Sequence, residues 1–208
     1  MKKDNEYLIS VYKKGIDIAK RRNECFEKAV DIKMSRGNKS NAFYGIFPPH
    51  ENIYILLANK NHGHLTKLEK NIDRKYYFDS DGKQIMQETY WENSVTGCKF
   101  FDYGEKSVDI IFCSMLRNEI SAVAKCEFSD DGRLKYYMYG TCGFEKLGYY
   151  PIHYHAYLYE YDGDDTYVDY ILCNTQKKGA PHETSITRYQ HTEGQLYEIF
   201  RKKMLLTE

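Results

Sequence analysis

One short segment, GYYPIHYHAYLYEYDG at residues 148–163, holds the residue types best suited to chemistry. His153 and His155 are separated by a single residue, so on a β-strand both side chains point to the same face. Two imidazoles on one face can act as metal ligands. The same alternation places four tyrosines on that face: Tyr149, Tyr157, Tyr159 and Tyr161. The opposite face is predicted to be the core-facing one, with Tyr150, Ile152, Tyr154, Ala156 and Leu158.

A second segment repeats this pattern. In residues 133–141 alternation puts Tyr137 and Tyr139 outward, and the chain turns at an acidic stretch after residue 161. If the two strands are neighbours, they form one tyrosine- and histidine-rich face beside the acidic turn. Tyrosine provides a large contact area at low entropic cost in binding surfaces. The predicted partner-binding residues are Tyr137, Tyr139, Tyr157, Tyr159, Tyr161, Asp162, Asp164 and Asp165.

Three interpretations of this face stay open. The aromatic side chains can be ordinary cross-strand pairs that stabilise the sheet. They can form a protein-recognition face, either for a different protein or for a second copy in a homodimeric structural or regulatory module. The histidine pair can bind a metal ion.

The metal interpretation has a family resemblance behind it. The segment 148–163 resembles the first cupin motif, in which a glycine is followed by H-x-H, a glutamate and a second glycine. The resemblance implies that His153, His155 and Glu160 are metal ligands of a metal-dependent enzyme.

Other catalytic signatures are absent from the sequence. It has no G-x-G-x-x-G, P-loop, H-E-x-x-H or G-x-S-x-G motif. The six cysteines form no C-x-x-C pair, and Cys142 in TCGF is expected to be buried or incidental. The sequence therefore favours a non-enzymatic protein without a cofactor, although it leaves the question of an enzyme open.

The charge balance argues against a nucleic-acid partner. The 208 residues include 30 Lys and Arg and 30 Asp and Glu, so the formal net charge is zero, whereas nucleic-acid binders usually carry a basic surplus. The N-terminus MKKDNEYLIS lacks an apolar signal region, and no run is long enough to span a bilayer. We expect a cytoplasmic protein that binds another protein and no membrane.

The remaining pattern predicts an α+β fold in a single domain, residues 1–208. Residues 5–33 have helical periodicity, with a possible break at Gly15, within an N-terminal helical segment 1–34. The alternating pattern of residues 50–190 predicts a twisted antiparallel meander of about six or more strands, including a buried strand at 52–58. Residues 192–205 predict a C-terminal helix. Both terminal helices are expected to pack on one face of the sheet.

Three Asp-Gly pairs, at residues 81, 131 and 162, recur between strand-like runs and predict hairpin tips of type I′. The units YYFDSDGKQIMQETYW and CEFSDDGRLKYYMYG resemble the hairpin units of MORN-like and YD-type repeats. Such units occur in small bacterial cytoplasmic proteins, including immunity proteins that neutralise polymorphic toxins. The resemblance implies a binder that masks a toxin domain.

Overall fold

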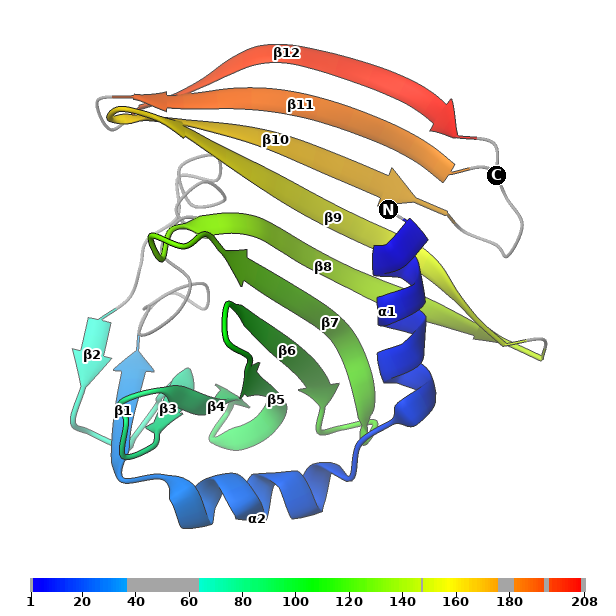
Figure 1. The fold of residues 1–208 in the computed structure, drawn as a ribbon. Helices are drawn as coiled ribbons and strands as arrows, with labels where there is room; N and C mark the ends of the chain where they lie inside the picture. Colours follow the sequence, from blue (N-terminus) through cyan, green and yellow to red (C-terminus); the bar gives the residue numbers. More distant parts are fainter. Residues whose placement is uncertain (1, 37–63, 147, 176–181, 193–194, 207–208) are drawn as a thin grey trace. The chain divides into compact units, whose positions relative to one another are not determined.

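The computed structural model describes residues 2–36, 64–146, 148–175, 182–192 and 195–206 (Figure 1). These residues form two helices and a 12-stranded sheet, so the α+β class is confirmed, whereas the predicted number of about six strands is too small. The predicted strand at 52–58 lies outside the described residues.

The elements follow in chain order. The helices and first strands are α1 (Lys2–Lys14), α2 (Ile18–Lys28), β1 (Asp31–Arg36), β2 (His64–Thr66), β3 (Arg74–Phe78) and β4 (Gln84–Trp91). The later strands are β5 (Ser94–Tyr103), β6 (Ser107–Ser114), β7 (Glu119–Phe128), β8 (Leu134–Glu145), β9 (Gly148–Asp162), β10 (Asp165–Asn174), β11 (His182–Thr192) and β12 (Gln195–Leu206).

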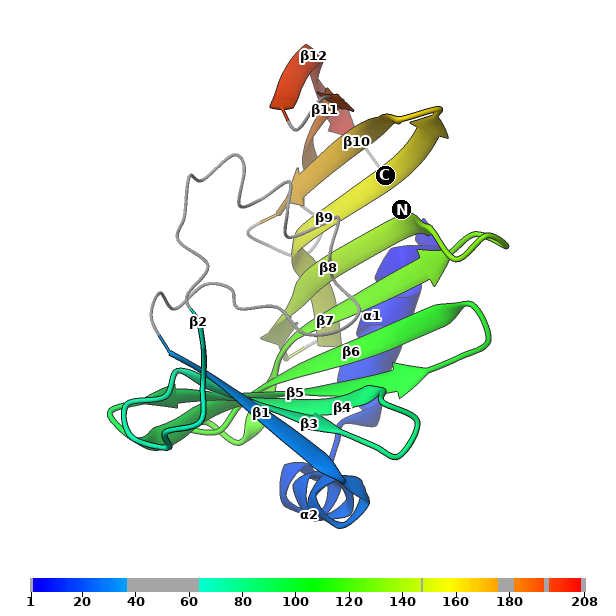
Figure 2. The ribbon, with the colours of Figure 1, turned by 90° about the vertical axis from the view of Figure 1, so that its left-hand side faces the viewer.

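The sheet is a meander over most of its width. Its order runs from β12 down to β3, each strand beside the next in sequence, and ends in β1 and β2. Strand β1 lies between β3 and β2 and is antiparallel to both (Figure 2). Neighbouring β-strands joined by short turns can pair antiparallel without a crossover helix, which is why two helices suffice for so many strands.

The chain divides into two compact units. The first comprises Met1–Gly15, Tyr103–Asp109 and Ala122–Glu208. In it, α1 packs on β8 and β9, as Figure 1 shows, and Leu8 of α1 is fully buried. The second comprises Ile16–Asp102 and Ile110–Ser121, and in it α2 packs on β3 and β4.

The N-terminal helical prediction is confirmed with one correction. Gly15, at a φ of 65°, separates α1 from α2, and its amide donates to the carbonyl of Val11. Asp17 caps α2 by accepting from the amide of Lys20. Residues 31–33 are strand rather than helix, because β1 finds a full ladder of partners on β3.

The predicted C-terminal helix over 192–205 is wrong, because residues 195–206 form the strand β12. Its backbone pairs with β11 from Gln195 to Leu206. The side chains expected on one buried helical face are half-exposed, with Ile199 at 49% and Phe200 at 45%. Helical spacing was therefore coincidental here, and main-chain pairing with β11 decides the structure.

The Asp-Gly pairs do form hairpin tips, between β3 and β4, β7 and β8, and β9 and β10. Their turn type differs from the prediction, because only the glycines have positive φ, at 74° for Gly82 and 79° for Gly132. In the first tip, Asp79 accepts hydrogen bonds from the amides of Asp81 and Lys83. A turn with two successive positive φ values, as type I′ requires, lies instead at Glu92 and Asn93.

Candidate binding surface of strands β7 to β10

The predicted tyrosine and histidine face exists. Strands β8 and β9 are neighbours, with Tyr137 opposite Tyr157 and Tyr139 opposite His155. The rings of the first pair lie 5.8 Å apart and those of the second pair 5.9 Å apart. Tyr170 of β10 extends the cluster by contacting both His155 and Tyr157. These are the cross-strand aromatic contacts that stabilise a sheet.

Much of this face is not available to a partner. Three of the predicted tyrosines are buried, with 3% of Tyr137, 8% of Tyr157 and 7% of Tyr159 exposed. Tyr139 is half-buried. Tyr137, Tyr157 and Tyr159 are therefore not exposed for contact with a partner, and the rings of Tyr137 and Tyr170 pack against Tyr157.

The end of β9 is the accessible part of the predicted site. Asp162 and Asp164 are exposed, and Tyr161 is half-buried. The Tyr161 hydroxyl donates to the carbonyl of Leu134 at 2.7 Å, while the Arg133 guanidinium lies 4.4 Å from its ring centroid. Asp165 accepts from Gln190 at 2.9 Å. Two acidic groups therefore remain free to meet a partner at this tip.

The two histidines lie together, and their rings are 4.2 Å apart. Nδ1 of His153 is 2.5 Å from Oδ1 of Asn174, and Nδ1 of His155 is 2.7 Å from the hydroxyl of Tyr170. Burial, with a smaller contribution from His153, lowers the pKa of His155 to about 4. His155 is therefore neutral at pH 7 and is held by a tyrosine.

The ligand set implied by the cupin resemblance does not assemble. Glu160 forms an ion pair with Arg188 instead of joining the histidines. Across the described ranges, no group of three or more His, Cys, Asp or Glu side chains could hold a metal ion. Glu160 belongs to the alternate positions of β9 that also include Leu158 and Asp162, so strand alternation separates it from His153 and His155.

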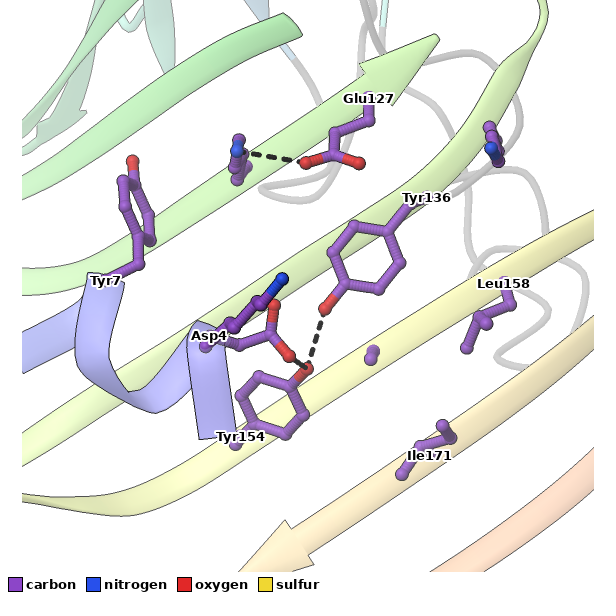
Figure 3. A pocket seen from close by; sticks show the side chains of 11 residues that line it. Asp4, Tyr7, Glu127, Tyr136, Tyr154, Leu158 and Ile171 are labelled. Atoms are coloured by element: carbon purple, nitrogen blue, oxygen red, sulfur yellow. Dashed lines mark hydrogen bonds and ion pairs between the residues drawn. The ribbon is translucent and has the colours of Figure 1, made fainter. Parts of the chain in front are cut away.

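A hollow of about 550 Å³ lies on the other face of the same strands, beside α1 (Figure 3). Its floor is formed by Tyr136, Ala156, Leu158 and Ile171. Leu158 is 44% exposed although the sequence placed it in the core. The next residues on the same face of β9, Glu160 and Asp162, are also exposed. These two polar residues in the sequence could have indicated that this end of the face is accessible to solvent.

One wall of the hollow is a chain of hydrogen bonds. The Tyr154 hydroxyl donates to a carboxylate oxygen of Asp4 at 3.0 Å, and the hydroxyls of Tyr136 and Tyr154 are 2.7 Å apart. Figure 3 shows the two rings pointing their hydroxyls toward each other while Asp4 reaches in from α1. Burial raises the pKa of both phenols above the ordinary value. The chain fixes α1 to the sheet, and neither phenol can act as a base near neutral pH.

The rim of the hollow is charged. Lys125 pairs with Glu127 at 2.9 Å, and its ammonium lies 5.4 Å from the ring centroid of Tyr7. Lys3 and Lys135 also line the rim and are exposed. An apolar floor inside a charged rim matches the anatomy of protein-recognition sites, in which an apolar anchor is surrounded by polar contacts.

The contribution of α1 to this site could not be predicted, because helical periodicity does not reveal which strand a helix covers.

Cys142, the cysteine considered as a nucleophile, is half-buried, and burial raises the pKa of its thiol to about 12. A protonated thiol is a weak nucleophile, which argues against a catalytic role.

Comparisons of the chain with protein-family models, with curated proteins and with solved structures found no match. In the part of the chain that the structure describes, no helix has the length and apolar character needed to cross a membrane.

Proposed function

We propose that this chain is a non-enzymatic binding protein that neutralises a bacterial toxin domain by stoichiometric association. The observation that carries the proposal is the hollow beside α1, where an exposed leucine lies on an apolar floor inside a charged rim. Tyr136 and Tyr154 in this hollow stay protonated. Lys125 and Glu127 form an ion pair at the rim and are not arranged as a nucleophile beside a base. Such a site is suited to binding.

The exposed acids at the end of β9 give the proposal a second contact. The side chains of Asp162 and Asp164 have no hydrogen-bond or ion-pair partner among the described residues, so a basic group of the partner can approach them without displacing an existing side-chain contact. Charged groups at the edge of an interface mainly increase the association rate and specificity. In this proposal the hollow supplies affinity and the acidic tip supplies orientation.

Co-expression tests the function directly. The C-terminal domain of the gene product encoded immediately upstream would be produced in a bacterium with and without this chain, and surviving colonies would be counted. We expect the domain to kill alone and this chain to restore growth. A domain that is harmless, or that kills in the presence of this chain, would overturn the proposal.

A single substitution tests the hollow. We expect Leu158→Lys to weaken binding of the toxin domain by about 10- to 100-fold, because full burial of a leucine contributes about 1.5–3 kcal/mol. Isothermal titration calorimetry measures the affinity. The matched control is Leu116→Lys, which places the same charge at a leucine that is 80% exposed and lies outside the hollow. Equal affinities for the two variants would remove the hollow from the binding surface.

A further inference from the structure

Three sulfur atoms, one from the middle of β5 and two from the end of β6 and the residue after it, form a chain in the second unit. The Cys98 thiol donates to Sδ of Met115 at 3.6 Å. The thiols of Cys98 and Cys113 are hydrogen-bonded to each other. The amide of Met115 donates to the carbonyl of Thr96 at 3.1 Å, which holds the methionine against β5 although β6 ends at Ser114. The result is a continuous chain of thiol, thiol and thioether.

The spacing of the Cys98 and Met115 sulfurs matches that of two ligands around one metal ion. A metal–sulfur bond is about 2.3 Å long, so two sulfurs 3.6 Å apart can share an ion at an angle of about 100°. That angle lies close to the angle between ligands of a tetrahedral site. Cys98 and Met115 therefore need little movement to become ligands, and Cys113 already touches Cys98.

We propose that Cys98, Cys113 and Met115 form a binding site for Cu(I). Thiolates and thioethers are soft ligands, and soft ligands select Cu(I). When the ion binds, the two thiols release their protons to solvent and two copper–thiolate bonds form, while the thioether donates a lone pair and no atom changes oxidation state. Zn²⁺ is less suited, because its structural sites need four ligands and do not use methionine.

The surroundings of the sulfurs support this assignment. Only 2% of Cys98 and 3% of Cys113 is exposed, and both belong to an apolar cluster that includes Phe100. A dry apolar shell limits the access of water and oxidants to a metal site. Met115 packs against this cluster but is only half-buried, so it offers the ion a route from solvent. The assignment does not depend on the proposed function, because it concerns other residues.

The experiment is a competition between the full-length protein and the chromophoric Cu(I) chelator bicinchoninate, under anaerobic conditions. We expect the reduced protein to withhold about one Cu(I) per chain from the chelator. The double substitution Cys98→Ser and Cys113→Ser should abolish this retention. Met115→Leu conserves volume and should fold normally, yet it should weaken retention by at least about 10-fold, because loss of a ligand should cost no less than loss of a group that only orients a ligand, which costs about 10- to 100-fold.

Cys25→Ser is the matched control. Cys25 is buried in the same cluster, but its thiol donates to the carbonyl of Ile85, away from the three sulfurs. Circular dichroism of each variant confirms that it is folded. Failure of the wild-type protein to withhold copper would overturn the proposal. An unchanged affinity in Met115→Leu, or an equal loss in Cys25→Ser, would also overturn it.

Discussion

Replacing Glu88 with alanine is expected to lower the free energy of unfolding by about 3–5 kcal/mol, the cost of leaving one partner of a buried ion pair alone. The Glu88 side chain is 2% exposed and pairs with Arg22. Its carboxylate also accepts hydrogen bonds from Tyr77 at 2.6 Å and Tyr90 at 2.7 Å. Alanine would leave all three donors without their acceptor inside the second unit.

Denaturant unfolding followed by circular dichroism measures this loss. The control is Glu127→Ala, which removes a carboxylate from a partly exposed pair with Lys125. Exposed pairs contribute about 0–1 kcal/mol, so the control should change stability little. Similar losses of unfolding free energy in the two variants would show that the buried hydrogen bonds of Glu88 stabilise the protein no more than an exposed ion pair does.

The same carboxylate makes stability depend on pH. Burial alone would raise the pKa of Glu88, but hydrogen bonds from Tyr77, Tyr90 and Arg22 outweigh burial, and the pKa lies below its ordinary value of 4.5. Because the folded pKa is below the unfolded one, the stabilisation is complete above the unfolded pKa and is lost as pH falls through the folded pKa. Glu88→Gln should therefore lose less stability than the wild type between neutral and acidic pH. A parallel acid dependence in both proteins would contradict this.

The substitution Leu8→Ala is expected to cost about 2–5 kcal/mol, because it removes a fully buried side chain and leaves a cavity. Leu8 lies over Gly140 of β8, where a Cβ atom would come within 2.8 Å of Leu8 Cδ2 and 3.2 Å of the His153 carbonyl oxygen. The glycine therefore makes room for the leucine that anchors α1 on the sheet.

A double-mutant cycle tests this packing. We expect Gly140→Ala to destabilise the wild type and to cost less in the Leu8→Ala background, since the nearest atom of the clash is then gone. Unfolding curves of the four proteins give the coupling energy. Leu116→Ala, at a residue 80% exposed, is the control and should change stability by less than about 0.5 kcal/mol. Strict additivity of the two substitutions would show that Leu8 and Gly140 do not share a contact.

The local backbone conformation and the faces of the strands could be predicted from the sequence. Glycine at positive φ determines the three Asp-Gly hairpin tips and the break between α1 and α2, because few other residues adopt that conformation without strain. Strand alternation correctly placed His153 and His155 beside Tyr157 on one face. The sequence left open whether the strands of Tyr137 and Tyr157 are neighbours, and the structure places the two residues opposite each other because the consecutive strands β8 and β9 pair.

Long-range contacts decided the rest. The segment 195–206 has apolar spacing compatible with either a helix or a strand, and only the free edge of β11 made it a strand. Tyr137 and Tyr159 are buried by other parts of the folded chain that pack on their face of the sheet. Leu158 is exposed because α1 does not cover its part of the opposite face. Periodicity assigns a residue to a face of its strand, but it carries no information on which element covers that face. The sequence by itself therefore determined the turns and the side-chain alternation, and the tertiary structure decided which of the two faces could form a binding site.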